Sequence, residues 1–217
     1  MTLARRAIAE GVGTALLLAA VVGSGIMGER LSGGNVAIAL LANSLATGFA
    51  LIALVVAFGP RSGAHFNPVV TVALALRGDV AKRDLGPYLL AQFAGAFLGV
   101  IAAHGMFDLA LVQSGVRVRT GLAQWWSEFV ATFGLVFLVL SLTKKTAGAA
   151  PFAVGGYIAA AYWFTASTSF ANPAVTLARG FTQTFAGIAL DNVVGFVVAQ
   201  IAGAGAALTV DRMTRAA

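Results

Sequence analysis

Residues 63–71 read GAHFNPVVT and residues 168–176 read TSFANPAVT. Both stretches place an Asn-Pro pair ahead of a short apolar run. Asn is a preferred N-cap residue and Pro is favoured at the first helical position, so Asn67 and Asn172 each predict the start of a helix. A helix of about 11 residues is roughly 16 Å long, about half the hydrocarbon thickness of a bilayer. The two stretches therefore predict re-entrant half-helices, which enter a membrane without crossing it.

The composition of the whole chain places these half-helices in lipid. Of the 217 residues, 59% are hydrophobic and 10% are charged, whereas soluble domains carry about 25% charged residues. These values exclude a soluble domain and an intrinsically disordered chain. The sequence has no cysteine, two histidines and eight acidic residues. So small a supply of reactive groups predicts no metal site, no cofactor and no enzyme.

Stretches almost free of charge predict six transmembrane helices, since one crossing needs about 20 apolar residues. The predicted spans cover about residues 5–27, 35–57, 86–106, 122–142, 150–168 and 188–210. An even number of spans puts both termini on one side. If that side is the cytoplasm, ten of the 14 Lys and Arg residues lie inside and four outside, as the positive-inside rule requires. We expect these charges to set the topology rather than to bind nucleic acid.

Two more pairs of segments repeat between the halves of the chain. EGVGT at residue 10 matches EFVAT at residue 128, and AQFAGA at residue 91 matches AQIAGA at residue 199. Each half holds three predicted spans, an odd number, so the halves must be inverted in the membrane. We predict one domain, residues 1–217, built from inverted repeats of about 5–107 and 122–210. Such repeats with broken helices place the working site at their interface, near the midplane.

That interface would carry the N-termini of the half-helices, the asparagine side chains that cap them and exposed backbone carbonyls. Two helix N-termini meeting there make a positive zone that disfavours cations and protons, so we expect little leak of small ions. The cap asparagines would keep their amide hydrogens for a passing solute. Non-helical backbone at this depth is tolerated where it is buried or lines a wet cavity. Candidate pore-lining carbonyls are those of Gly63, Ala64, His65, Thr168, Ser169 and Phe170.

Together these features resemble the aquaporin, or major intrinsic protein, family over nearly the whole chain. The resemblance rests on residues 62–71, on the second Asn-Pro motif and on the pair Glu10 and Glu128. It implies an all-α membrane protein with six transmembrane helices and two re-entrant half-helices, assembled as a homotetramer with one pore in each subunit. The pore caps that it implies are Asn67, Pro68, Val69, Asn172, Pro173 and Ala174. Val stands where the first motif usually has Ala, which leaves the capping unchanged.

Glu10 and Glu128 are carboxylates inside predicted spans, which marks them as candidates for function. The resemblance implies that each accepts hydrogen bonds from a re-entrant loop and orients its carbonyls. A proton relay is the alternative. His104, at the end of a predicted span, is interpreted as an interfacial residue.

The resemblance also implies a selectivity filter at Thr47, Ala160, Ser169 and Val175. The family usually has an aromatic residue at the first of these positions and an Arg at the last. We therefore expect a wider, uncharged constriction. Arg179, one turn beyond Val175, could swing toward the outer mouth and partly replace the missing charge. The favoured interpretation is that it snorkels to the interface or pairs near the C-terminus of the half-helix.

These observations predict a passive channel for small uncharged solutes: glycerol-like polyols, neutral metalloid acids such as arsenite, and water. A water-selective aquaporin is the alternative, and a proton-coupled secondary transporter using Glu10 or Glu128 is a weaker one. An intramembrane enzyme ranks far below, because the sequence shows no catalytic constellation. The expected partners are membrane lipid, the solutes and further copies of the chain. The resemblance implies the inner membrane of a bacterium, and the distribution of Lys and Arg predicts that both termini are cytoplasmic.

Overall fold

The computed structural model describes residues 1–142 and 146–214, and all regular structure in these ranges is helical. Two 3-10 turns, Lys82–Asp84 and Ala147–Ala149, precede α4 and α6. The α-helices are α1 (Leu3–Leu31), α2 (Val36–Ser62), α3 (Pro68–Arg77), α4 (Leu85–Met106), α5 (Leu122–Ser141), α6 (Ala150–Phe164), α7 (Pro173–Arg179) and α8 (Leu190–Thr214).

Five helices within the described ranges are long and apolar enough to cross a membrane, namely α1, α2, α4 with its preceding turn, α5 and α8. The remaining predicted span, residues 150–168, corresponds to α6 but is shorter, with 15 residues. It ends at Phe164 because Thr165 adopts an extended backbone, from which the chain turns into the second re-entrant loop. The predicted end at residue 168 is therefore wrong.

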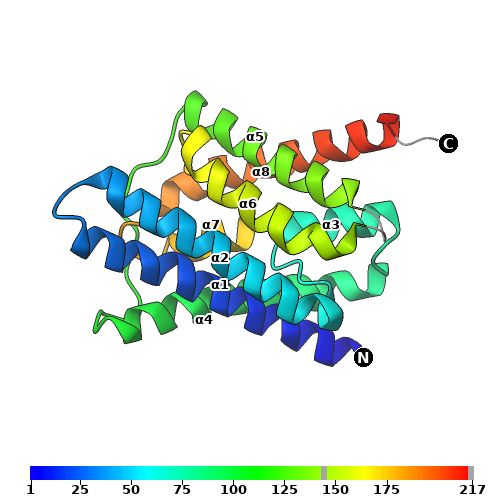
Figure 1. Ribbon diagram of the computed structural model, residues 1–217, viewed down its shortest axis with the longest axis horizontal. Helices are drawn as coiled ribbons and strands as arrows, with labels where there is room; N and C mark the ends of the chain where they lie inside the picture. Colours follow the sequence, from blue (N-terminus) through cyan, green and yellow to red (C-terminus); the bar gives the residue numbers. More distant parts are fainter. Residues whose placement is uncertain (143–145, 215–217) are drawn as a thin grey trace.

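The long helices form a bundle around the two half-helices. α1 packs against α4 and α2, α5 against α8, and α2 against α6. The start of α1 and the end of α8 lie at the same end of the bundle (Figure 1), as an even number of crossings requires. The half-helix α3 contacts α8 and α5 from the other half of the chain, and α7 contacts α4. Each half-helix is therefore held partly by the opposite half.

Glycines allow the closest of these helix contacts. A Cβ atom at Gly95 of α4 would overlap the carbonyl oxygen of Gly11 in α1, and one at Gly203 of α8 would overlap that of Phe129 in α5. Small residues let membrane helices approach to backbone contact, where dispersion forces replace the hydrophobic effect. The two equivalent contacts bring the centre of each half close enough for the buried bonds described below.

Candidate functional site

Both half-helices begin where the Asn-Pro pairs predict. The side-chain oxygen of Asn67 accepts a hydrogen bond from the backbone nitrogen of Val69 at 3.1 Å. The oxygen of Asn172 accepts from the nitrogens of Ala174 and Val175 at 3.0 and 3.3 Å. Pro68 and Pro173 follow as the first helical residues. The predicted caps of α3 and α7 are confirmed.

The amide groups of the two asparagines also join the half-helices to each other. The Asn67 Nδ2 donates to the Ala171 carbonyl at 2.7 Å, and the Asn172 Nδ2 donates to the Phe66 carbonyl at 2.8 Å. An amide nitrogen carries two hydrogens, so one on each asparagine is engaged. The sequence predicted that both amide hydrogens of each asparagine are left for a solute. This expectation is corrected, because each asparagine keeps one amide hydrogen.

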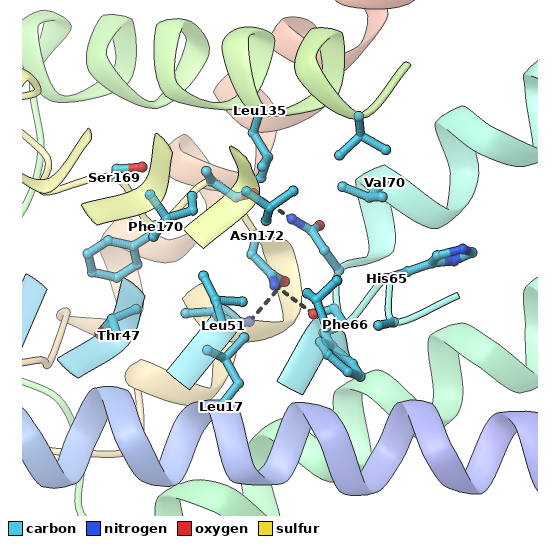
Figure 2. A pocket seen from close by; sticks show the side chains of 18 of the residues that line it. Leu17, Thr47, Leu51, His65, Phe66, Val70, Leu135, Ser169, Phe170 and Asn172 are labelled. Atoms are coloured by element: carbon cyan, nitrogen blue, oxygen red, sulfur yellow. Dashed lines mark hydrogen bonds between the residues drawn. The ribbon is translucent and has the colours of Figure 1, made fainter. Parts of the chain in front are cut away.

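A cavity of about 200 Å³ lies beside these caps, and its wall is largely apolar. Thr47, Ser169 and Phe170 lie at one end, His65 at the other, and Asn172 between them (Figure 2). The apolar wall includes Leu17, Val21, Leu51, Val55, Leu135, Val139 and Ile158. Polar groups are thus confined to the ends and to the level of the two asparagines.

The backbone before each cap adopts the left-handed conformation repeatedly. In the first loop, Ala64 and Phe66 have φ angles of 52° and 50°. In the second loop, Thr168, Ser169 and Ala171 have φ angles of 61°, 49° and 46°. Non-glycine residues adopt this region rarely, and it needs support from surrounding structure. Gly63, with φ at 95°, could not be replaced without strain, and a Cβ there would press on the His65 ring.

Five of the six predicted carbonyl residues line the cavity: Gly63, Ala64, His65, Ser169 and Phe170. Thr168 is not among the lining residues, and this part of the prediction is corrected. Its side-chain hydroxyl instead lies 3.5 Å from the guanidinium of Arg119. Phe66 and Ala171, the residues just before the caps, line the cavity as well.

Glu10 supports the first loop. One carboxylate oxygen accepts from the Ser62 hydroxyl at 2.6 Å and from the backbone nitrogen of His65 at 3.0 Å. The other accepts from the backbone nitrogen of Phe66 at 2.7 Å and from the Gln92 amide at 2.8 Å. Hydrogen bonds to a charged acceptor are stronger than neutral ones. They stabilise the left-handed backbone of this loop.

Glu128 has the same place in the second half. Its carboxylate accepts from the backbone nitrogens of Phe170 and Ala171, both at 2.8 Å, and from the Gln200 amide at 2.6 Å. Neither glutamate is exposed. These are the contacts that the family resemblance implies.

The sequence alone did not predict the role of two buried glutamines. Gln92 and Gln200 also donate to the hydroxyls of Thr71 and Thr176, each at 2.8 Å. Each glutamine thus links a glutamate to a half-helix. The repeated Ala-Gln segments in the sequence contain both residues, and their buried amides were the available signal.

Three of the four predicted filter residues lie together. Thr47, Ser169 and Val175 are buried and line the cavity, with Thr47 and Ser169 at the same end of it (Figure 2). Ala160 is exposed and does not line it. Residues of a helix turn by about 100° each, so Ala160 points away from the face that carries Ile158 and Tyr162.

Tyr162 takes the predicted place of Ala160. It is 3% exposed, lines the cavity, and its hydroxyl lies 3.2 Å from that of Thr47. The wall at this level is therefore more polar and bulkier than expected. α6 carries no charge or Asn-Pro motif from which its pore-facing side could have been read.

Arg179 does not snorkel to the interface as interpreted from the sequence. It is 2% exposed, lines the cavity and donates through Nε to the Ala186 carbonyl. Its guanidinium carbon lies 3.3 Å from the centre of the Phe170 ring. The expectation of an uncharged constriction is therefore wrong, because Arg179, one helical turn beyond Val175, places a positive charge at the cavity wall.

Arg119 lies in the connection between α4 and α5, and its contacts go beyond the topological role that the sequence predicts. Its guanidinium donates to the carbonyls of Gly187 and Ser167 at 2.9 and 3.2 Å, and lies 5.1 Å from the centre of the Phe170 ring. Burial, together with Arg179 and Arg117, lowers the pKa of Arg119 to about 9. The group stays charged at neutral pH, so two buried cations, Arg119 and Arg179, lie near the Phe170 ring.

His104 is fully buried rather than interfacial. Its Nδ1 lies 3.0 Å from the Leu111 carbonyl and its Nε2 lies 2.7 Å from the Thr182 hydroxyl. It ties the connection after α4 to the chain that follows α7. The interpretation from the sequence is corrected, since a charge-free span end gives no sign of the partners that fold over it.

A match to the major intrinsic protein family extends over residues 1–169. The chain belongs to the major intrinsic protein family. It is 54% identical over 210 residues to the aquaglyceroporin AqpS of Rhizobium meliloti (strain 1021), covering 97% of this chain and 90% of the relative. It is 32% identical over 165 residues to aquaporin Z of Bradyrhizobium diazoefficiens, covering 68% of this chain and 67% of the relative.

The fold is that of the same family. The X-ray structure of the aquaglyceroporin from Plasmodium falciparum superposes with a TM-score of 0.75 at 19% sequence identity, over 98% of this chain and 95% of that one. The predicted fold class is thereby confirmed. Family membership and the apolar helices make this a multi-pass membrane protein.

Proposed function

We propose that this protein is a passive channel for small uncharged solutes, and not an enzyme. One observation carries the proposal: the apolar cavity passes the two half-helix caps, where Asn67 and Asn172 each keep one amide hydrogen. An apolar wall with a few fixed donors binds a solute weakly enough to release it. The paired helix N-termini disfavour cations at the same level.

The solutes that we propose are glycerol-like polyols, neutral metalloid acids such as arsenite, and water. Val175 supports this choice because it is apolar where the family usually has an arginine, and Ser169 adds a hydroxyl beside it. The name of one relative, the aquaglyceroporin AqpS, agrees with it. A water-selective pore is the second candidate, favoured by Tyr162 and Arg179 at the same end of the cavity.

We propose further that the protein is a homotetramer in a bacterial inner membrane, with both termini cytoplasmic. The distribution of ten positive residues inside and four outside supports this orientation. In this arrangement the end of the cavity with His65 faces the cytoplasm and the end with Thr47 faces outward. The inverted repeats of about 5–107 and 122–210 would form one domain with one pore.

Stopped-flow light scattering on proteoliposomes tests the proposal. We expect glycerol and water to enter vesicles containing the protein at least tenfold faster than empty vesicles. Fast water entry without glycerol entry would favour the water-selective alternative. If neither water nor glycerol entered faster than into empty vesicles, the proposed channel function would be contradicted. Uptake that saturates and follows pH would favour a coupled transporter.

A matched pair of variants tests the solute choice. Val175→Arg restores the usual family residue and should lower glycerol permeability by at least tenfold, while water permeability falls less than threefold. Val175→Ile, which adds a methylene without a charge, is the control and should reduce both fluxes slightly. Equal loss of water and glycerol in the Arg variant would contradict the proposed filter position.

A further inference from the structure

A cluster of positive side chains lies where α1 and α4 begin, and none of its members lines the cavity. The Arg6 guanidinium is 2.8 Å from one carboxylate oxygen of Asp84, and the Arg83 guanidinium is 3.9 Å from the other. Asp84 is buried, whereas the Arg83 side chain is 85% exposed. The neighbouring Arg5 and Lys82 are exposed, and neither has a carboxylate at ion-pair distance in the part of the chain that the structure describes. The cluster thus holds four cations and one carboxylate.

The packing of the helices does not require these charges, as the second half of the chain shows. Gln124 of α5 stands at the position equivalent to Arg6, four residues before the supporting glutamate. Asn192 of α8 stands at the position equivalent to Asp84, eight residues before the supporting glutamine. α5 and α8 nevertheless approach to backbone contact, as α1 and α4 do. The charges at the start of α1 and α4 therefore serve something other than the contact between the two helices.

Exposed apolar side chains continue from the cluster along both helices. On α1, Ile8 and Val12 follow Arg5 at intervals of three and four residues, which places all three on one face. Ile8 is 64% exposed, and on α4 Leu90 and Leu98 are 73% and 61% exposed. A surface with cations at one end and alkyl side chains beyond them matches a lipid with a negative head group and two acyl chains. Basic sites between membrane helices bind such head groups.

We infer that the start of α1 and α4 binds an anionic phospholipid. Its phosphate contacts Arg5, Lys82 and Arg83, and its acyl chains lie along the exposed residues of α1 and α4. Charge-assisted hydrogen bonds from guanidinium groups to phosphate oxygens are strong. Arg6 is held by Asp84 and fixes the cluster between the two helices. The inference depends on the membrane location of the protein and not on its activity as a channel.

Thermal unfolding of the purified protein in detergent, with added lipid, tests this site. Dioleoylphosphatidylglycerol should raise the melting temperature in a saturable way, and dioleoylphosphatidylcholine should leave it unchanged. In the double variant Arg5→Gln/Arg83→Gln, the concentration of the anionic lipid that gives half of the shift should rise at least fivefold. Arg61→Gln/Arg212→Gln is the matched control, because it removes two exposed cations from the ends of α2 and α8. Its half-shift concentration should stay within twofold of the unaltered value.

Three results would overturn the inference. One is an equal shift with the two lipids, and another is equal weakening in the two double variants, which would show that the basic residues act only through their total charge. The third is an equal shift with glycerol 3-phosphate, which would indicate a site for a free phosphate rather than for a lipid. If Arg5→Gln/Arg83→Gln does not fold, Arg83→Gln alone replaces it, since this side chain is largely exposed. The single variant should raise the half-shift concentration at least twofold, and an unchanged value would contradict the site.

Discussion

The two re-entrant segments share their supports and differ in what they present to the cavity. Glu10 and Glu128 hold equivalent backbone nitrogens, and each segment ends in an asparagine that bonds to the other segment. At the cavity wall, the first segment presents His65 and Leu74 where the second presents Phe170 and Arg179. The repeat therefore preserves the loop geometry, while different residues at equivalent positions distinguish the two ends of the cavity.

Removing a supporting glutamate should have the largest effect. Glu10→Ala and Glu128→Ala each leave two buried backbone N–H groups without an acceptor, at about 1–3 kcal/mol each. The left-handed loops would lose the bonds that stabilise them. We expect glycerol permeability in proteoliposomes to fall below a tenth of the unaltered value for both variants, and the melting temperature in detergent to fall with it.

Two further variants sharpen that result. Glu29→Ala is the control, because Glu29 in α1 is half exposed and its contact with Arg117 is at 3.7 Å, so it should behave as the unaltered protein. Glu10→Gln keeps one carboxamide oxygen for the loop and should retain more flux than Glu10→Ala. A proton relay predicts a different result. Glu10→Gln and Glu10→Ala would then lose the same share of the flux, and uptake by the unaltered protein would depend on a pH gradient.

The halves also differ in how they fill the space behind the loops. In the first half Gly13 lies against the Phe66 ring, where a Cβ would overlap the ring. The equivalent positions in the second half are Ala131 and Ala171, both fully buried. A large side chain with a glycine thus fills the same space as two alanines. The pairing explains why the two loops can differ in sequence and still place their carbonyls alike.

Gly13→Ala should break this pairing. Overpacking costs about 1–3 kcal/mol, and the displaced ring would carry with it the Phe66 carbonyl that accepts from Asn172. We expect a lower melting temperature and a several-fold loss of glycerol permeability. The double variant Gly13→Ala/Phe66→Ala copies the second half and should be more stable than the sum of its single changes predicts. Simple additivity would show that the two positions are independent.

Much of this architecture could be predicted from the sequence because it follows from local rules. The Asn-Pro caps, the charge-free spans and the paired glutamates each have a direct physical meaning in lipid. The pore wall of α6 and the place of Arg179 could not be predicted in the same way. α6 has no polar periodicity to indicate its inner face. Arg179 contacts Phe170, which precedes α7, and Ala186, which reaches it only when the chain after α7 folds back.

The smallest expected effects come from changes at Ala160 and Tyr162 on the two sides of α6. Ala160 is exposed on its outer side, so Ala160→Leu should leave water and glycerol permeability within twofold of the unaltered protein. Tyr162→Phe removes a hydroxyl that lies 3.2 Å from that of Thr47, an interaction of about 1 kcal/mol. We expect a change of about two- to fivefold in glycerol permeability with little change in stability, because the ring still fills the wall.

Comparing these two variants decides which residue of α6 faces the solute. A silent Tyr162→Phe together with a blocked Ala160→Leu would mean that the helix is turned by about 200° from its place beside Thr47. Such a rotation would carry Ile158 and Val154 away from the cavity as well, since they share a face with Tyr162. The end of the cavity beside Thr47 would then be wide on the side of α6, and selection there would depend on the second re-entrant segment alone.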